Sequence, residues 1–498
     1  MALAGEEARG AKLRVFFIPF FASGHIIPMT DLACLFAKRP GVEPTMVITP
    51  ANAALIRPTL DHSASSGHTV QLLLYPFPSA AHLPSGIENL GSVSSDDTWK
   101  IHKAVDLSRE AHDRIIREHT PDAIISDIPF WWTTAIAKDL GIPRITFHAV
   151  GVFPQCIMNN LVKNRVHDHV PTDSHPFTIP DLPGPCIKMV KSELPEFLKH
   201  RDHLTSAWDD LKKSQLESYG VVVNAFYELE HEYCVITTER LIAWESLVRR
   251  TVALCDEQGK AGRGGGESEA ARENRERCMR WLGGKEAGSV LFVCFGSWCY
   301  FEDEQLREMA LGLEASGMEF LWVVRGDHGE HVKTEWMSEG WEERVKGKGL
   351  VVRGWAPQAA ILDHEAVGVF MTHCGWNSLL EGLGSGKPIA DADAVFEQFV
   401  NERLVVEVLK VGVRVWDGFR STFEKEKVVV PAEAIERAVR KFMEGSGEGE
   451  EMRKRAAEWV KIAGAAVAEG GSSHKDLNSL IDDLFILQHE RKNGKHIE

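Results

Sequence analysis

Residues 355–398 read WAPQAAILDHEAVGVFMTHCGWNSLLEGLGSGKPIADADAVFEQ, and this stretch is the most informative part of the chain. Its centre begins with an apolar run, 367–370, whose valines and phenylalanine are typical of a strand. A polar turn follows at 372–378, and the residues after it have helical spacing. Because a helix begins with unpaired backbone N–H groups, a strand, turn and helix in this order predict a site for an anion.

The turn carries the donors that a diphosphate on a nucleotide needs. Gly375 allows close approach of the backbone, and the N–H groups of Asn377 and Ser378 lie where the helix dipole is positive. The His373 ring and the Ser378 hydroxyl add donors, while Glu381, one turn further on, can accept from sugar hydroxyls. From this fragment alone, an ordinary βα crossover with a solvated turn is an equally good interpretation.

The whole stretch resembles the C-terminal signature of the plant secondary-product UDP-glycosyltransferases of family 1. The matching positions are Trp355, Ala356, Pro357, Gln358, Ile361, Leu362, His364, Gly368, Phe370, Thr372, His373, Cys374, Gly375, Trp376, Asn377, Ser378, Glu381, Gly386, Pro388, Glu397 and Gln398. Further matches are GHIIP at 24–28, IPDLP at 179–183, VVVNAFYELE at 221–230, FGS at 295–297 and GGSS at 470–473. The resemblance implies an enzyme that transfers a sugar, with glucose expected, from a UDP-sugar to a hydroxyl of a small apolar acceptor.

Composition agrees with such an enzyme. The 498 residues are long for one core and suggest two domains of about 200 to 250 residues each. A formal charge of −16, without a basic cluster, argues against a nucleic-acid partner. The nine cysteines show no CxxC pairing and are expected as reduced thiols. No apolar run reaches the roughly 18 residues of a membrane span, so we expect a cytoplasmic protein, and a monomer.

Strand and helix signals alternate along the chain. Strands are predicted at 13–20, 45–48, 70–75, 122–126, 144–148 and 220–224, and again at 289–295 and 319–325. A helix follows the first strand, and another at 303–316 ends at Gly317. This rhythm predicts parallel, doubly wound sheets. The resemblance implies the α/β GT-B fold, with two Rossmann-like domains facing across a cleft.

Domain limits follow from a segment that cannot form a core. Residues 256–277 have almost no apolar side chains and a run of three glycines, which is typical of a flexible linker. We therefore expect an N-terminal acceptor-binding domain at 1–253, a linker at 254–277 and a UDP-sugar-binding domain at 278–470. The spacing of the apolar residues in 471–498 predicts a last helix with one apolar face, and the resemblance implies that this helix packs back on the N-terminal domain.

His25 is the best candidate for a general base. It follows the first strand, at the carboxyl edge where doubly wound sheets bind ligands, although a lone histidine is more often structural. Asp127 ends a later strand at the same edge and can fix the tautomer of the histidine; a helix N-cap is its alternative role. The resemblance implies a catalytic dyad of His25 and Asp127, with inversion at the anomeric carbon.

The resemblance also assigns the donor site. Nucleotide contacts are implied at Trp355, Ala356, Gln358 and, for the ribose, Glu381. Diphosphate contacts are implied at His373, Asn377, Ser378 and Ser297. Sugar contacts are implied at Trp376, Glu397 and Gln398. Glutamine at 398 goes with glucose, no cofactor or metal is expected, and the UDP-sugar is a co-substrate.

The chain departs from the family beside the sugar contacts. Asp391, Ala392 and Asp393 stand where Thr-Trp-Pro is usual, so loop shape and sugar choice are open there. Read alone, this triplet resembles the metal-binding DxD of GT-A enzymes. A UDP-sugar-binding homologue with altered sugar choice or weak transfer activity is therefore an alternative function. A dinucleotide oxidoreductase is disfavoured because no GxGxxG follows a strand.

The acceptor is defined least well. Apolar residues near the dyad in the sequence are candidates for its pocket, or for the core: Phe21, Phe130, Trp132, Val150 and Phe153. They favour a flat, largely apolar molecule, and the resemblance implies a flavonoid, another phenolic, a terpenoid or a steroid.

Overall fold

The structure is a computed structural model that describes residues 12–78, 82–94, 97–199, 203–240, 248–251, 269–296, 301–324, 336–392, 396–443 and 447–494. The chain forms two compact units, and each is built from more than one stretch of sequence. Unit 1 comprises Met1–Gly151, Ser206–Gly266 and Ala465–Glu498. Unit 2 comprises Val152–Thr205 and Glu267–Gly464.

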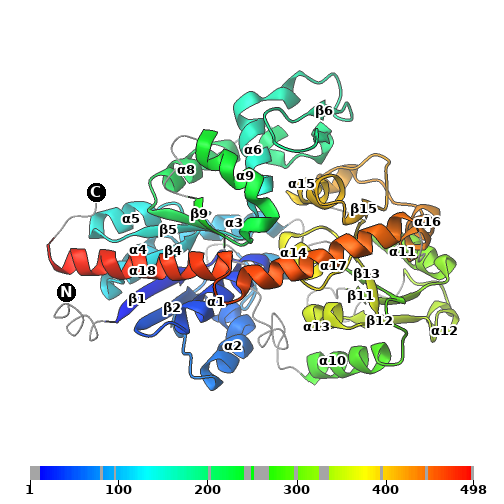
Figure 1. Cartoon of the computed structure of the whole chain (residues 1–498), viewed down its shortest axis with the longest axis horizontal. Coiled ribbons are helices and arrows are strands. Elements are labelled where there is room, and N and C mark those ends of the chain that lie inside the picture. Colours follow the sequence, from blue (N-terminus) through cyan, green and yellow to red (C-terminus); the bar gives the residue numbers. More distant parts are fainter. Residues whose placement is uncertain are drawn as a thin grey trace. The chain divides into compact units, whose positions relative to one another are not determined.

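Unit 1 contains a parallel sheet whose seven strands, among the described residues, lie in the order β3-β2-β1-β4-β5-β8-β9 (Figure 1). The strands are β1 (Leu13–Ile18), β2 (Val42–Ile48), β3 (Gln71–Leu74), β4 (Ala123–Asp127), β5 (Arg144–His148), β8 (Gly220–Val223) and β9 (Val248–Thr251). From β1 the chain adds β2 and β3 on one side and later returns to place β4 on the other. The strand order therefore reverses between β1 and β4, where open α/β sheets bind ligands.

The helices of unit 1 alternate with these strands. They are α1 (Ser23–Ala37), α2 (Pro50–Ser65), α3 (Thr98–Leu107), α4 (Arg109–His119), α5 (Thr133–Leu140), α8 (His203–Leu216), α9 (Tyr227–Arg240) and α18 (Ser472–Lys492), with a 3₁₀ turn at Leu90–Ser92. The last helix, α18, contacts β1 and β9. Its apolar face, Leu477, Leu480, Ile481 and Leu484, is buried in the same core as the side chains of β1.

Polar contacts fix the end of α18 beside β1. The Gln488 side chain donates to the carbonyl of Lys12 at 2.9 Å and to Asp122 at 2.8 Å. Arg491 donates to the second oxygen of Asp122 at 2.5 Å. Asp122 also accepts from the backbone N–H of Arg14 at 3.0 Å. One buried carboxylate therefore joins the C-terminal helix to the first strand.

Unit 2 repeats this architecture. Its parallel sheet has six strands among the described residues, in the order β12-β11-β10-β13-β14-β15. They are β10 (Val290–Cys294), β11 (Glu319–Val324), β12 (Gly349–Arg353), β13 (Val367–Thr372), β14 (Ile389–Asp391) and β15 (Gly412–Arg414). The order reverses between β10 and β13. The prediction of two parallel, doubly wound α/β domains is thus confirmed.

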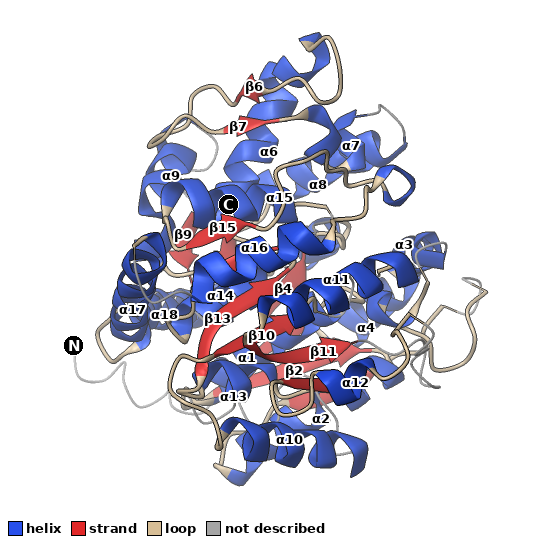
Figure 2. Cartoon of the chain, turned by 90° about the vertical axis from the view of Figure 1, so that its right-hand side faces the viewer, coloured by secondary structure: helices blue, strands red, loops and turns tan. Residues whose placement is uncertain are grey.

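The helices of unit 2 are α6 (Val152–Asn164), α7 (Glu196–Lys199), α10 (Glu269–Leu282), α11 (Asp303–Ser316), α12 (Trp341–Arg344), α13 (Gln358–Asp363), α14 (Trp376–Gly384), α15 (Gln398–Arg403), α16 (Ala432–Met443) and α17 (Glu448–Val467). Shorter elements are β6 (Phe177–Thr178), β7 (Lys188–Met189), 3₁₀ turns at Val166–His169, Lys191–Glu193 and Glu424–Glu426, and a π-helical turn at Leu404–Val408. Several helices of unit 2, among them α11, α13 and α14, flank this sheet, whereas α6 and α7 lie near β6 and β7 (Figure 2). Helices α11 and α16 lie side by side.

The compact units differ from the expected domain limits in two places. Residues 152–205 belong to unit 2 and not to the N-terminal unit. Their side chains contact other parts of unit 2: Glu193 accepts from Arg403, and Lys199 donates to Thr422. Residues 269–277 were expected in the linker but lie in α10, whose Ala271 side is buried. A charged segment with sparse apolar residues can form an amphipathic helix when another part of the fold covers those residues.

The packing of α18 can be tested with two residues on that helix. Leu484 is 1% exposed, whereas Ile486 is 58% exposed. We expect Leu484→Ala to lower the free energy of unfolding of unit 1 by about 2–4 kcal/mol, because it removes buried methyl groups and leaves a cavity. The control, Ile486→Ala, should change it by less than about 0.5 kcal/mol. Urea denaturation followed by circular dichroism measures both, and equal effects would contradict this packing.

Candidate functional site

His25 and Asp127 meet at the reversal of strand order in unit 1. Helix α1 begins at Ser23, shortly after β1, so that His25 lies in its first turn. Asp127 is the last residue of β4, the strand paired with β1. The two side chains are joined by a contact of 2.8 Å between Nδ1 of His25 and Oδ2 of Asp127. The structure therefore brings the two predicted dyad residues together.

Backbone groups hold the carboxylate of Asp127 in place. It is completely buried, and its Oδ2 also accepts from the N–H of Phe20 at 3.1 Å. Its Oδ1 accepts from the N–H of Ile128 at 2.9 Å. Helix α5 begins only at Thr133, so Asp127 is not its N-cap. With Nδ1–H of His25 as the donor of this hydrogen bond to the carboxylate, the basic lone pair of the imidazole lies on Nε2.

A buried cation lies close to this pair. Arg144 begins β5, and its Nε donates to Ser126 Oγ at 3.0 Å and to Thr133 Oγ1 at 3.3 Å. Burial lowers the pKa of Arg144 to about 9, and the charge of Asp127 acts in the opposite direction. The guanidinium is thus still charged at neutral pH. An arginine in an apolar strand carries no motif, so the sequence analysis missed it.

Three of the predicted acceptor residues form one aromatic cluster in unit 1. The rings of Phe21 and Phe130 are 5.8 Å apart, and those of Phe130 and Trp132 are 5.6 Å apart. The cluster surrounds His112, whose Nε2 contacts the Tyr75 hydroxyl at 3.0 Å. All three aromatic residues are buried, as a core would require. Their role toward an acceptor therefore stays a prediction.

The other two predicted acceptor residues lie elsewhere. Val150 is partly exposed and follows β5 in unit 1. Phe153 is buried in the first turn of α6, which belongs to unit 2.

The predicted diphosphate turn of unit 2 is closely packed. His373 follows β13 and is buried, and its Nδ1 contacts Thr372 Oγ1 at 3.2 Å. A Cβ atom on Gly296 would lie 2.6 Å from Cε1 of this ring, and one on Gly375 would lie 2.6 Å from Nε2. Burial lowers the pKa of His373 to about 4, so the ring is neutral at pH 7. It can donate one N–H to an anion without carrying a charge itself.

Cys374, between His373 and Gly375, has a φ of 55°. This left-handed conformation is strained for a residue with a side chain, and such strain tends to gather at functional sites. Its carbonyl accepts from the Asn401 side chain at 3.0 Å. The strained turn is therefore held by a contact from α15.

Three residues predicted to bind the UDP-sugar are joined by hydrogen bonds from one of them, Gln358. Nε2 of Gln358 donates to Ser378 Oγ at 3.2 Å and to Glu381 Oε2 at 2.8 Å. Gln358 begins α13, and the two acceptors lie on successive turns of α14. The residues predicted for the nucleotide, the diphosphate and the ribose thus form one polar group.

Trp355 and Ala356 lie in the loop between β12 and α13. The side chain of Asn274 in α10 donates to the carbonyls of Arg353 at 3.0 Å and Trp355 at 2.9 Å, and so fixes this loop. Asn274 was missed because it lies in the segment expected to be a linker.

The predicted sugar contacts lie at the starts of two helices. Trp376 is buried at the start of α14, with the partly buried Asn377 after it. Glu397 is the N-cap residue of α15, and Gln398 is its first residue; both are buried. Asn401 lies 3.4 Å from Glu397 as well as contacting Cys374, and the sequence motif did not include it. Ser297 lies outside the described residues.

Each unit thus has a parallel α/β sheet with predicted functional residues at the reversal of strand order, His25 and Asp127 in unit 1 and His373 in unit 2. Two such Rossmann-like units in one chain, one with a His–Asp pair and one with a diphosphate turn, define a glycosyltransferase of the GT-B fold. No helix within the described ranges has the length and apolar character needed to cross a membrane.

Comparisons with known proteins identify the family. Residues 269–415 match the family model described as UDP-glucoronosyl and UDP-glucosyl transferase. The chain is 38% identical to an anthocyanin 3'-O-beta-glucosyltransferase of Gentiana triflora, over 96% of this chain and 99% of that protein. It is 39% identical to a scopoletin glucosyltransferase of Nicotiana tabacum, over 95% and 98%. The chain belongs to the plant family 1 UDP-glycosyltransferases and is a UDP-sugar-dependent glycosyltransferase for small acceptors.

Solved structures agree with this assignment. UGT73P12 of Glycyrrhiza uralensis, complexed with glycyrrhetinic acid 3-O-monoglucuronide, has a TM-score of 0.86 and 33% identity, with 97% of this chain and 98% of that one covered. UGT71G1 of Medicago truncatula, complexed with UDP-glucose, has a TM-score of 0.77 and 25% identity, with 95% and 98% covered. The GT-B fold predicted from the sequence is confirmed.

The packing of the diphosphate turn can be tested by adding one methyl group. Gly375→Ala would place a Cβ 2.6 Å from Nε2 of His373, so the ring must move. We expect UDP affinity to fall at least about tenfold, which corresponds to about 1.4 kcal/mol. Gly384, near the end of the same helix, has no atom within 4 Å of the added Cβ and provides the matched control. Isothermal titration with UDP measures both; equal affinities would contradict a role for the His373 position.

Proposed function

We propose that this enzyme transfers glucose from UDP-glucose to a hydroxyl group of a small, largely apolar acceptor, with direct displacement and inversion at the anomeric carbon. The observation that carries the proposal is the 2.8 Å contact between His25 and Asp127 at the carboxyl edge of the sheet of unit 1. A hydroxyl is a weak nucleophile at neutral pH, and a positioned base is what it needs to attack the anomeric carbon.

His25 acts as the general base through Nε2. Its side chain is 26% exposed, so an acceptor can reach it, whereas its partner Asp127 is completely buried. As the hydroxyl attacks, its proton moves to Nε2 and the ring becomes an imidazolium. Asp127 stabilises that cation and keeps the ring in the orientation for attack. Two backbone N–H groups hold the Asp127 carboxylate in the orientation that this role needs.

The diphosphate leaving group is stabilised in unit 2. The first N–H groups of α14, those of Trp376, Asn377 and Ser378, provide the positive end of a helix of nine residues. The neutral His373 and the Ser378 hydroxyl add directed donors, and Ser297 is proposed to add another. Because these donors are fixed before the reaction, little reorganisation is needed as charge develops on the diphosphate.

The remaining donor contacts follow the order of the motif. Trp355 stacks on the uracil, with Ala356 and Gln358 beside the base, and Glu381 accepts from the ribose hydroxyls. Glu397, Gln398 and Trp376 contact the sugar. Glutamine at position 398 favours glucose, and the Nicotiana and Gentiana relatives named as glucosyltransferases support that choice.

The acceptor class is a rigid molecule with several rings and one reactive hydroxyl. The relatives' names refer to an anthocyanin and to scopoletin, and the Glycyrrhiza neighbour is complexed with glycyrrhetinic acid 3-O-monoglucuronide. The aromatic cluster of Phe21, Phe130 and Trp132, together with Val150 and Phe153, is proposed to contact the apolar faces of such a molecule.

The arrangement of Asp391 disfavours the alternative metal-binding interpretation of residues 391–393. Its Oδ2 lies 3.4 Å from Nη1 of Arg420, and a guanidinium so close opposes a divalent cation. Asp393 lies outside the described residues.

We propose that the enzyme acts in the cytoplasm, as a monomer, with the UDP-sugar as its co-substrate and without a cofactor. The cysteines support the location. Four of them are free thiols in the described part of the chain, as a reducing compartment would keep them: Cys186, Cys278, Cys294 and Cys374.

The dyad is tested by removing its base. We expect His25→Ala to lower kcat about 10²- to 10⁴-fold, because no side chain then accepts the hydroxyl proton. The affinity for UDP, whose proposed contacts all lie in unit 2, should stay within about twofold of the wild type. UDP release from UDP-glucose with a panel of phenolic and triterpenoid acceptors measures turnover.

The exposed His62 provides the matched control, and His62→Ala should turn over normally. Turnover by the wild type that does not change with His25→Ala would contradict the assignment of the base. UDP binding without turnover on any acceptor would support the alternative of a binding protein with weak activity.

A further inference from the structure

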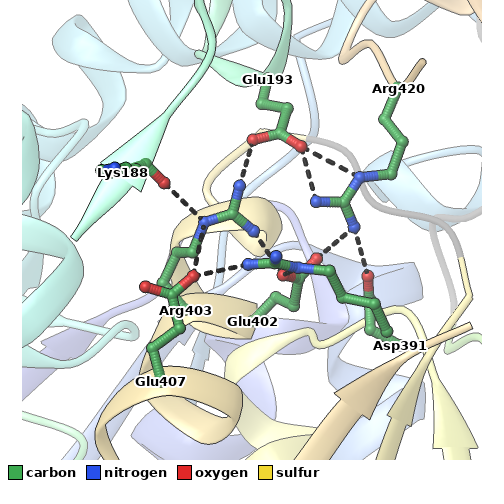
Figure 3. Close-up of polar contacts among 8 residues, drawn as sticks. Lys188, Glu193, Asp391, Glu402, Arg403, Glu407 and Arg420 are labelled. Atoms are coloured by element: carbon green, nitrogen blue, oxygen red, sulfur yellow. Dashed lines mark hydrogen bonds and ion pairs between the residues drawn. The ribbon is translucent and has the colours of Figure 1, made fainter. Parts of the chain in front are cut away.

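Seven charged side chains form a largely buried network in unit 2 (Figure 3). This charged network consists of Glu193, Asp391, Glu402, Arg403, Glu407, Arg414 and Arg420. Its members come from the 3₁₀ turn before α7, from β14, from α15 and the turn after it, from β15 and from the following loop. None of these residues was assigned a role from the sequence motif.

Glu402 is the centre of the charged network. Its side chain is completely buried near the end of α15. One carboxylate oxygen, Oε1, accepts from both Arg403 and Arg414. The other, Oε2, accepts from Nη1 of Arg420. Three guanidinium groups from different segments therefore converge on one carboxylate.

Arg420 contacts both ends of the segment that contains the proposed sugar contacts. We call the described residues 391–392 and 396–402 the sugar segment. Nη1 of Arg420 lies 3.4 Å from Asp391 at its start and also donates to Glu402 at its end. The guanidinium lies 4.8 Å from the centre of the Phe399 ring, in the middle of α15. One side chain thus joins the two ends of the segment and covers the helix between them.

A second carboxylate fixes Arg420 from the other side. Nε and Nη2 of Arg420 both donate to Oε1 of Glu193, at 3.0 and 2.6 Å. Oε2 of Glu193 accepts from Arg403 at 2.5 Å, and Arg403 also donates to the carbonyl of Lys188 at 3.0 Å (Figure 3). Glu193 is itself buried. The guanidinium of Arg420 is thus held in one orientation, which a single ion pair would not achieve.

The position of α15 depends on such contacts. The helix has six residues, too few to be stable alone in water. Gln398 begins it, and Glu402 lies four residues later on the same face. A shift of Glu402 would therefore move Gln398 with it. The proposed sugar contact Gln398 thus lies on the helix that the charged network holds at its other end.

The charged network contains three guanidinium groups and four carboxyl groups, so its positive and negative charges are equal when the Asp391 carboxyl is neutral. Burial, followed by the charge of Glu402, raises the pKa of Asp391 well above its ordinary value, although Arg420 opposes this. Burial alone would raise the pKa of Glu402 as well, but Arg403, Arg420 and Arg414 outweigh it and lower that pKa to about 2. The three arginines then face three carboxylates, those of Glu193, Glu402 and Glu407. A neutral Asp391 stays beside Glu402 without repulsion.

We propose that Arg420 is a positioning residue for the donor sugar, which joins Asp391 to Glu402 and so fixes Gln398 for contact with the glucosyl group. The proposal rests on the proposed function, in which Gln398 contacts the sugar. A positioning role and a purely structural role of Arg420 differ in which ligands they affect. A structural role affects UDP and UDP-glucose equally, whereas a positioning role affects only the ligand that carries the sugar.

The proposal predicts different effects of one substitution on two ligands. Arg420→Gln should raise KM for UDP-glucose about tenfold, because Gln398 loses its fixed position. The Kd for UDP should change by less than about twofold, since UDP has no sugar to contact α15. Initial rates at saturating acceptor give KM and kcat, and isothermal titration gives the Kd. Arg344, which forms a two-contact ion pair with Glu314 elsewhere in unit 2, provides the control, and Arg344→Gln should leave both constants unchanged.

Two further variants keep the test decisive. Arg420→Lys retains the charge but cannot reach three carboxyl groups at once, so it should show a smaller rise in the same KM even if Arg420→Gln does not fold. Gln398→Ala should raise KM for UDP-glucose, and no change would refute the proposed sugar contact itself. A rise with Gln398→Ala but none with either Arg420 variant, or equal losses for UDP and UDP-glucose, would overturn the positioning role alone.

The neutral state of Asp391 has its own test. Asp391→Asn keeps the shape and the absence of charge, so we expect the Tm to stay close to that of the wild type. Glu402→Gln removes a charge that three arginines share, and it should lower the Tm by more than about 5 °C. Thermal denaturation measures both variants. A fall in Tm as large for Asp391→Asn as for Glu402→Gln would show that Asp391 is ionised in the network.

Discussion

Both halves of the candidate site depend on one constraint, the reversal of strand order within a parallel sheet. β1 pairs with β4 in unit 1, and β10 pairs with β13 in unit 2. In each pair, the strands that come next in the chain are added on opposite sides of the sheet. The residues that follow the two strands then converge. In unit 1 this brings His25 to Asp127; in unit 2 it brings the backbone of Gly296 against the ring of His373. The chemistry of each unit follows from the pairing of two strands.

Much of this could be predicted from the sequence because the signals are local. Apolar runs of strand length alternate with segments whose apolar residues have helical spacing. The limits of a helix such as Asp303–Ser316 can be predicted from the residues at its two ends. The dyad could be predicted because each member directly follows or ends a strand. The group of Gln358, Ser378 and Glu381 could be predicted as ligands, but not as partners, since their hydrogen bonds join two helices.

What the sequence did not reveal depends on contacts between distant segments. Asn274 lies in α10 and holds the loop of Trp355 through a hydrogen bond. The sequence of α10 is typical of a linker because few of its residues are apolar, and the sequence does not show which part of the fold covers them. Arg420 and Glu193 are 227 residues apart, and neither belongs to a motif. Charged residues are mostly solvated, so a pattern of charge alone gives no reason to expect burial.

Buried charge has a different basis in the two units. Asp127 is held by backbone N–H groups and one imidazole, so it can stabilise the positive charge that develops on that imidazole during the reaction. Glu402 is stabilised by three guanidinium groups, which hold its pKa too low for any such exchange. A carboxylate of that kind can only hold structure in place. Arg420 joins it to Asp391, at which the sequence begins to depart from the motif that it resembles. Asp391 is held here by residues outside that motif, so a departure from a motif has to be weighed together with the contacts that surround it.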